Sequence, residues 1–87
     1  MESLMEKRIG VVGIVVEDMT VVSKINSVLH EHADLILGRM GVPYREKSIS
    51  VISLIVEGTT DQIGAMTGKL GNLPGVNVKS ALSKTGF

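Results

Sequence analysis

The chain has no cysteine and no tryptophan, and it holds a single tyrosine and a single phenylalanine. Without cysteine it can form no disulfide and offers no thiolate metal ligand and no cysteine nucleophile. With so few aromatic rings it has no platform on which the bases of a single-stranded nucleic acid could stack. Nine basic residues balance nine acidic ones, so there is no positive excess to neutralise a phosphate backbone. We therefore expect no direct contact with nucleic acid.

Long hydrophobic runs are also missing. Runs such as residues 11–16 are far shorter than the roughly 20 residues that a membrane-spanning helix needs. The first eight residues mix acidic, basic and apolar side chains, unlike a signal peptide. The sequence predicts a cytoplasmic protein without membrane contact. A length of 87 residues predicts one domain, with residues 1–7 as an N-terminal extension and residues 8–87 as the folded unit.

Apolar patterns divide the chain into four strands and two helices. The strands are rich in Val and Ile, and we expect them at residues 7–17, 33–40, 49–57 and 76–83. Apolar residues at helical spacing predict a helix over residues 20–32 with Thr20 as its N-cap. Thr59 and Gln62 have the spacing of a capping box at the start of a second helix. Pro43 has no amide hydrogen to donate, so residues 41–44 are predicted to form a turn.

An internal repeat relates the two halves of the chain. Residues 13–20 and 53–60 both consist of an apolar strand, a glutamate, a two-residue turn and a threonine. Two such βαβ halves predict an α+β, ferredoxin-like βαββαβ fold. Right-handed connections then place both helices on one face of a four-stranded antiparallel sheet, with the strands at 7–17 and 49–57 in the middle.

The two middle strands are apolar on both faces. A sheet that helices cover on one face only should alternate apolar and polar residues, and these strands do not. An uncovered second face would expose several hundred Å², which soluble monomers rarely tolerate. We therefore predict a homo-oligomer, a dimer or tetramer; the alternative is that some of these residues lie at strand ends under loops. The residues assigned to the oligomer interface are Val12, Ile14, Val16, Ile52, Leu54 and Val56.

His30 and His32 stand near the end of the first predicted helix. Two residues apart on a helix, they point about 200° away from each other and cannot chelate one ion together. A favourable position near the negative end of the helix explains them without a ligand. Only across an oligomer interface could one of them join a metal site. His30 is therefore a weak metal candidate, and the sequence names no cofactor.

Residues 38–46 are the most unusual stretch. They hold the only tyrosine, Tyr44, and two of the three arginines, Arg39 and Arg45. Tyr and Arg are typical anchors of interfaces, and two guanidinium groups could hold an anion or a carboxylate. The alternative is a solvated charged turn. No paired carboxylates and no nucleophile–base arrangement can be identified, so we do not expect an enzyme.

Two stretches of the chain carry a resemblance to known proteins. Residues 29–36, LHEHADLI, followed by a strand and a βαβ unit, resemble the C-terminal domain of nickel-responsive repressors. Those domains are ACT-like βαββαβ oligomers that bind small effectors at subunit interfaces. Residues 38–46, GRMGVPYRE, and residues 68–76 make the whole chain similar to a family of short ACT-like proteins described as proposed regulators of the iron-only hydrogenase system.

The resemblance implies a stand-alone regulatory subunit that binds a small-molecule effector and acts on transcription through a DNA-binding partner protein. Of the nickel-binding positions it supports only His30, because Gly41 and Pro43 stand where that family has histidines. The alternative is a protein-interaction or assembly factor without a small ligand. The expected ligand-binding residues are Asp18, Met19, His30, Arg39, Tyr44 and Arg45.

Overall fold

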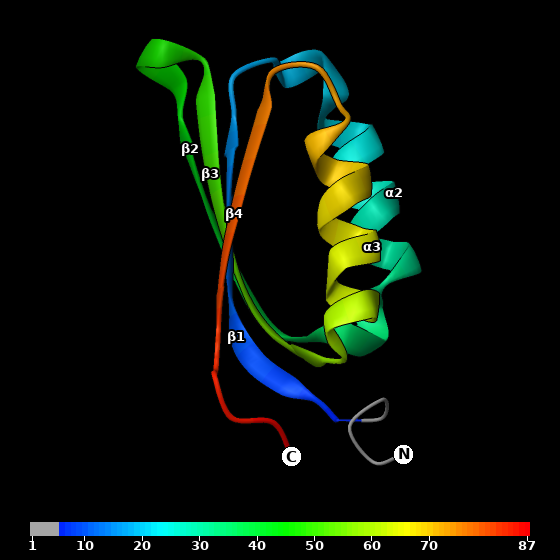
Figure 1. Ribbon diagram of the computed structural model, residues 1–87. Coiled ribbons are helices and arrows are strands. Elements are labelled where there is room, and N and C mark those ends of the chain that lie inside the picture. The colour runs from blue at the N-terminus through cyan, green and yellow to red at the C-terminus, as the bar shows by residue number, and fades with distance from the viewer. Residues whose placement is uncertain (1–5) are drawn as a thin grey trace.

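The structure, a computed structural model, describes residues 6–87 as four strands and two helices in the predicted order. All strand pairs are antiparallel in the order β2-β3-β1-β4, and both helices cover the same face of the sheet (Figure 1). The α+β ferredoxin-like βαββαβ fold is confirmed, with β1 and β3 in the middle. The elements are β1 (Arg8–Val16), η1 (Met19–Val21), α2 (Val22–Glu31), η2 (Ala33–Leu35), β2 (Ile36–Tyr44), η3 (Arg45–Lys47), β3 (Ile49–Gly58), α3 (Thr60–Gly71) and β4 (Val76–Leu82).

One hydrophobic core lies between the sheet and the two helices. Val12 of β1 pairs with Leu54 of β3, and both side chains are fully buried. Because strand side chains alternate, every second residue of β1 and β3 joins this core. The core cluster consists of Val12, Ile14, Val16, Val21, Ile25, Leu29, Ile52, Leu54, Val56, Ile63, Met66, Leu70 and Val76.

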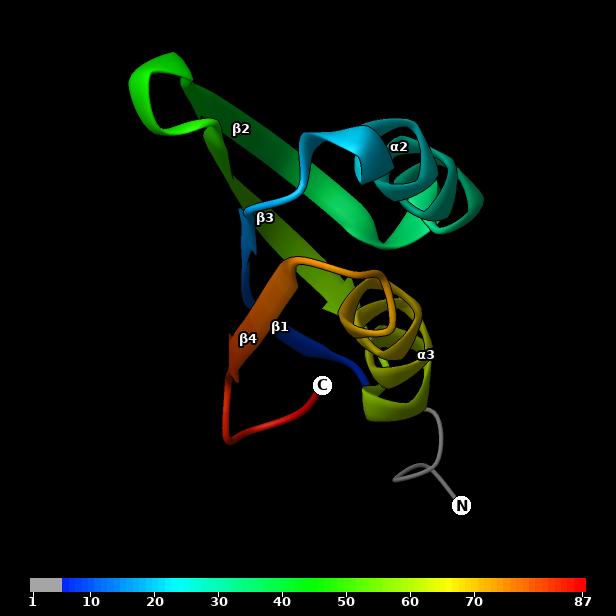
Figure 2. The same ribbon diagram turned by 90° about the horizontal axis from the view of Figure 1, so that it is seen from above.

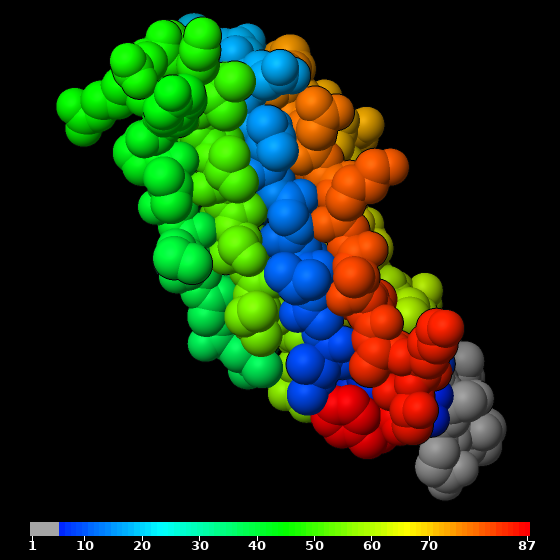
Figure 3. Space-filling model, turned by 90° about the vertical axis from the view of Figure 1, so that its left-hand side faces the viewer, coloured from blue at the N-terminus to red at the C-terminus, as the bar shows by residue number. Residues whose placement is uncertain are grey.

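The prediction of the oligomer interface named the wrong face of the sheet. Its residues, each 0–8% exposed, are Val12, Ile14, Val16, Ile52, Leu54 and Val56. They pack under the helices, so no partner can reach them. The uncovered side of the sheet, which we term the open face, consists of the alternate positions (Figure 3). Its large apolar residues at paired positions are Ile9, Val11, Val15, Met40, Val42, Tyr44, Ile49, Val51 and Ile55.

The second strand differs from its prediction. Residues 33–35 form the turn η2 rather than strand, and β2 instead continues to Tyr44. Pro43 is part of β2 and pairs with Ser50 of β3. β2 is an edge strand, so only one of its two sides is hydrogen-bonded to another strand. A proline is tolerated there because its missing amide hydrogen would face the unpaired side. The predicted turn at residues 41–44 is therefore wrong.

The helix starts are confirmed for one helix and corrected for the other. At α3, the Gln62 amide donates to Thr59 Oγ1 over 3.1 Å, and Gln62 Oε1 accepts from the Thr59 amide over 2.9 Å. This is the predicted capping box. Before α2, Thr20 lies inside η1 and is not the cap. Asp18 is the N-cap of η1, and its side chain accepts a hydrogen bond from the Thr20 amide. The N-cap of α2 itself is Val21, which makes no side-chain hydrogen bond.

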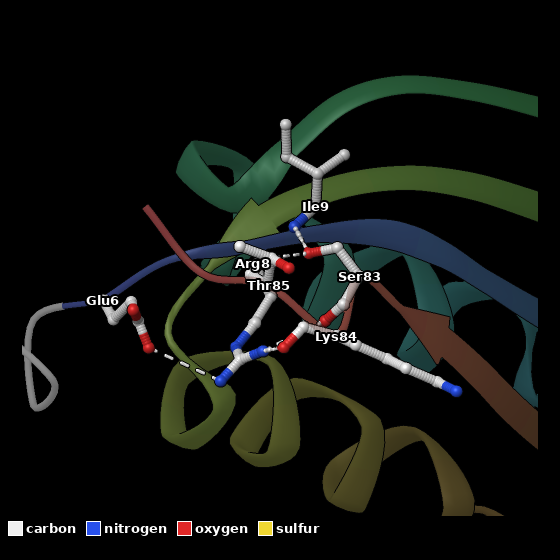
Figure 4. A network of polar contacts seen from close by, with 6 residues as sticks. All are labelled: Glu6, Arg8, Ile9, Ser83, Lys84 and Thr85. Carbon is white, nitrogen blue, oxygen red and sulfur yellow. Dashed lines mark hydrogen bonds and ion pairs between the residues drawn. The ribbon is translucent and has the colours of Figure 1, made fainter.

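The segment after β4 is bound to the start of β1 by a small polar network (Figure 4). Arg8 donates to the carbonyl oxygens of Ser83, over 3.2 Å, and Lys84. Its guanidinium also lies 3.5 Å from Glu6 Oε1. Ile9 N donates to Ser83 Oγ over 3.2 Å. The two ends of the described chain are thus held side by side. Residues 1–5, in the predicted N-terminal extension, lie outside the described residues.

Leu54→Ala tests the face assignment. We expect a loss of about 2–5 kcal/mol in the free energy of unfolding, because the substitution leaves a cavity in the core. Denaturant unfolding monitored by circular dichroism measures it. Ser27→Ala, on the exposed surface of α2, is the control and should change this energy by less than about 0.5 kcal/mol. Equal effects of the two variants would contradict the assignment.

Candidate functional site

A β-bulge determines which side chains of β2 face α2. The register of β2 against β3 shifts between Ile36 and Gly38, leaving Leu37 as an extra residue. One extra residue reverses the alternation of all residues that follow it. Arg39 consequently pairs with the buried Leu54 and lies on the helix side of the sheet. Without the bulge, its guanidinium would belong to the open face.

Beyond the bulge, the helix side of β2 carries no large apolar side chain. After Arg39 the positions on that side are Gly41 and Pro43. A Cβ atom added at Gly41 would meet only Ile52 Cγ1, at 3.8 Å, and the Val51 oxygen, at 4.0 Å. The space stays open as a hollow of about 300 Å³, which we term the apolar hollow. Its lining residues are Val16, Met19, Val22, Ile25, Asn26, Arg39, Gly41, Pro43, Ser50 and Ile52.

A second hollow adjoins the first along α2. It has a volume of about 390 Å³, and we term it the His30 hollow. Arg39 and Asn26 line both hollows, and Arg39 Nη2 donates to Asn26 Oδ1 over 3.1 Å between them. The two hollows together form the α2–β2 groove. The residues of the His30 hollow are Asn26, Leu29, His30, Ala33, Ile36 and Arg39.

The groove brings three of the predicted ligand-binding residues together. Met19 lines the apolar hollow, His30 lines the other hollow, and Arg39 lines both. The sequence reasoning missed Asn26 and Gly41. Asn26 lies four residues after Val22 and four before His30, so helical spacing along α2 could have revealed it.

Asp18 has a structural task at the turn between β1 and α2. Its Oδ1 accepts the Thr20 hydroxyl over 2.5 Å and the Thr20 amide over 2.9 Å. These two hydrogen bonds lower the pKa of the Asp18 carboxyl below its ordinary value of 3.8. Gly75, at φ 72°, lies against it, and a Cβ there would come within 2.6 Å of Asp18 Cβ. Asp18 does not line the α2–β2 groove.

Tyr44 and Arg45 lie at the end of the β2–β3 hairpin, which extends beyond the helices (Figure 2). Tyr44 belongs to the open face and is 50% exposed. Arg45 begins η3, about 20 Å along the strand from Arg39 at roughly 3.3 Å per residue. Arg45 does not line the groove that Arg39 lines, so the structure does not bring the two arginines together in one site.

The histidines do not form a metal centre with their neighbours. Within residues 6–87, no three His, Asp or Glu side chains gather closely enough to hold an ion. His32 instead places its Nε2 in a buried position, where it has no hydrogen-bond partner in the described part of the chain. His30, the weak metal candidate of the sequence, is exposed in the last turn of α2.

A separate groove lies between α3 and the edge strand β4. It has a volume of about 410 Å³. Gly64, Gly68 and Gly71 form its helix side, so this wall carries no side chains. Of the residues that the structure describes, Lys79 is the charged one that lines it. This groove has fewer groups for ligand recognition than the α2–β2 groove.

Solved structures with little sequence identity share the fold and define the class of domain. The apo form of CPII from Thiomonas intermedia K12, a nitrogen regulatory PII-like protein, is similar with a TM-score of 0.58 and 11% identity, covering 92% of this chain and 94% of that chain. The C-terminal domain of MgtC from Mycobacterium tuberculosis is similar with a TM-score of 0.63 and 11% identity, covering 93% and 90%. The chain is therefore a ferredoxin-like α+β domain.

The family is shown by a family model and by a much closer structure. Residues 8–80 match the TM1266-like family, described as "Iron-only hydrogenase system regulator, putative". The structure of uncharacterized protein TM1266 from Thermotoga maritima is similar with a TM-score of 0.86 and 39% identity, covering 91% of this chain and 100% of that chain. This chain belongs to the TM1266-like family. The description is that of a regulator and not of an enzyme, as the sequence predicted.

Among curated proteins, none matches this chain. Over residues 6–87, neither helix has the length and apolar character that crossing a membrane requires.

Thr20→Ala tests the account of Asp18. Removing the hydroxyl should raise the Asp18 pKa toward 3.8, because one of two hydrogen bonds to the carboxylate is lost. A carboxyl whose folded pKa is depressed stabilises the fold above its unfolded pKa, and that contribution disappears as the pH falls through the folded value. The variant should therefore be less sensitive to acid below about pH 4. A carbon-13 NMR titration of the Asp18 carboxyl measures the shift, with Thr67→Ala as control; an unchanged pKa would refute the account.

Proposed function

We propose that the protein is a self-associating regulatory subunit, which binds a second copy on its open face and a small effector in its α2–β2 groove. The observation that carries the proposal is that β2 contributes side chains to both of these sites. Its side chains alternate between the two surfaces, so Met40 and Val42 belong to the open face while Arg39 and Gly41 line the groove. One strand thus connects the two sites.

The open face has the composition of a buried surface. Val42, Val51 and Ile55 are 56%, 46% and 45% exposed in the isolated chain. Only two outward positions of the four strands carry a charge, Glu57 at the end of β3 and Lys79 on β4. Apart from Ser53 at its middle, the region between them is mainly apolar, of a kind that marks interaction sites.

A second copy of this chain fits the open face in size and in polarity. Four strands at about 4.8 Å spacing and nine residues at about 3.3 Å give a face of roughly 19 by 30 Å. Its projected area of about 600 Å² is at the lower end of what each partner of a stable interface buries. Each face carries one acidic and one basic residue, so two copies bring together no excess of one charge. We therefore favour a dimer through this face, which a further contact could extend to a tetramer.

The edge position of β2 supports communication between the sites. The strand is held on one side only, by β3, and contains a bulge and a proline. A ligand in the groove would contact the helix side of β2, and the second copy would contact the other side of the same strand. If the ligand shifts the association equilibrium, then association must shift ligand affinity by the same factor.

The description of the family supports a role in the iron-only hydrogenase system. An action on transcription would require a DNA-binding partner protein, because nine basic and nine acidic residues leave no net charge for a phosphate backbone. Such an action would take place in the cytoplasm.

Val51→Lys tests self-association. The wild type should form dimers or tetramers at micromolar concentration, while the variant should be a folded monomer, because a lysine on the open face would be buried without a partner. Sedimentation velocity measures the masses. Ser27→Lys, on the exposed surface of α2, adds the same charge and should keep the wild-type mass.

A monomeric wild type would contradict self-association. The open face would then be free for another protein, as the assembly-factor hypothesis requires.

A further inference from the structure

Most N–H donors of the Arg39 guanidinium form no hydrogen bond with residues 6–87. Arginine carries five N–H donors, and one bond from this group, Nη2 to Asn26 Oδ1 at 3.1 Å, is formed. The ion pairs of residues 6–87 join Arg8 to Glu6 and Lys69 to Glu31, so within this part of the chain Arg39 has no carboxylate partner. Its charge is available to an anionic ligand in the groove.

The space next to this charge is apolar and small. Val16, Ile25 and Ile52 of the apolar hollow are buried core residues, and Met19, Val22 and Pro43 complete its apolar wall. A volume of about 300 Å³ lies at the small end of ligand pockets. This hollow has the size for a short aliphatic or aromatic group.

Among residues 6–87, no aspartate or glutamate lines either hollow. An ammonium group in the groove would therefore lack a partner, and a buried unpaired charge is costly. Arg39 and Asn26 offer donors, and His30 adds a ring nitrogen in the adjoining hollow. The groove thus favours a carboxylate that carries no amino group.

We infer that the α2–β2 groove binds a small monocarboxylate, with the apolar tail in the apolar hollow and the carboxylate on Arg39. The ligand's role as effector rests on the proposed function. The binding itself does not, because all of the groups involved belong to one protomer.

Isothermal titration calorimetry with sodium hexanoate tests the inference. Hexanoate should bind with a Kd on the order of micromolar to low millimolar, given its few heavy atoms. Hexylamine keeps the tail and reverses the charge, while acetate keeps the charge and lacks the tail. Both should bind at least tenfold more weakly than hexanoate.

Two variants test the two parts of the site. Arg39→Gln should weaken hexanoate binding about 10- to 100-fold, because a charge-assisted hydrogen bond is lost. Gly41→Val should fill the apolar hollow and abolish binding. A Cβ at this position has room, since its nearest atom would be 3.8 Å away, and a circular dichroism melt checks that the variant folds. Arg45→Gln removes the same charge outside the groove and should bind as the wild type does.

Absence of hexanoate binding would overturn the inference, as would binding that Arg39→Gln leaves unchanged or that Arg45→Gln weakens equally. Light scattering on the same samples measures the oligomeric state. It therefore distinguishes a failure of the ligand inference from a failure of the proposed self-association. An oligomer that does not bind hexanoate refutes the ligand class alone, and a monomer that binds it refutes self-association alone.

Discussion

Two helices can cover only one face of a four-stranded sheet, and in this chain both faces are apolar. That mismatch is the constraint on which the rest of the structure depends. Val12 and Leu54 are buried beneath the helices, while Val51 and Ile55 remain about half exposed on the other side. The fold of one protomer is complete, yet it leaves in water a surface with the character of a core. Pairing of two such faces removes the mismatch with no additional domain.

The edge strand β2 is where this constraint meets the proposed ligand site. Its bulge at Leu37 turns Arg39 toward α2, and Gly41 then leaves the space that an apolar side chain would fill. The same residues that weaken packing between β2 and α2 therefore create the α2–β2 groove. Because β2 also supplies Met40 and Val42 to the open face, any displacement of the strand reaches both surfaces.

The sequence predicted what depends on local patterns. The repeat and the capping box together located both helices. The repeat also placed β1 and β3 in the middle of the sheet. It could not tell which face the helices cover, because adjacent positions such as Val11 and Val12 are equally apolar. It also missed the length of β2, since Pro43 excludes a central strand but not an edge strand. Arg39 could be predicted from its residue type. Gly41 was missed because it contributes to the groove by having no side chain.

Isotope-filtered NMR on a mixture of labelled and unlabelled protein tests the central claim most directly, because it reports contacts between copies. Intermolecular Overhauser effects should appear at the methyl groups of Val11, Val51 and Ile55 and be absent at Val12 and Leu54. Intermolecular effects at Val12 and Leu54, or none at any of these methyl groups, would contradict the pairing of open faces.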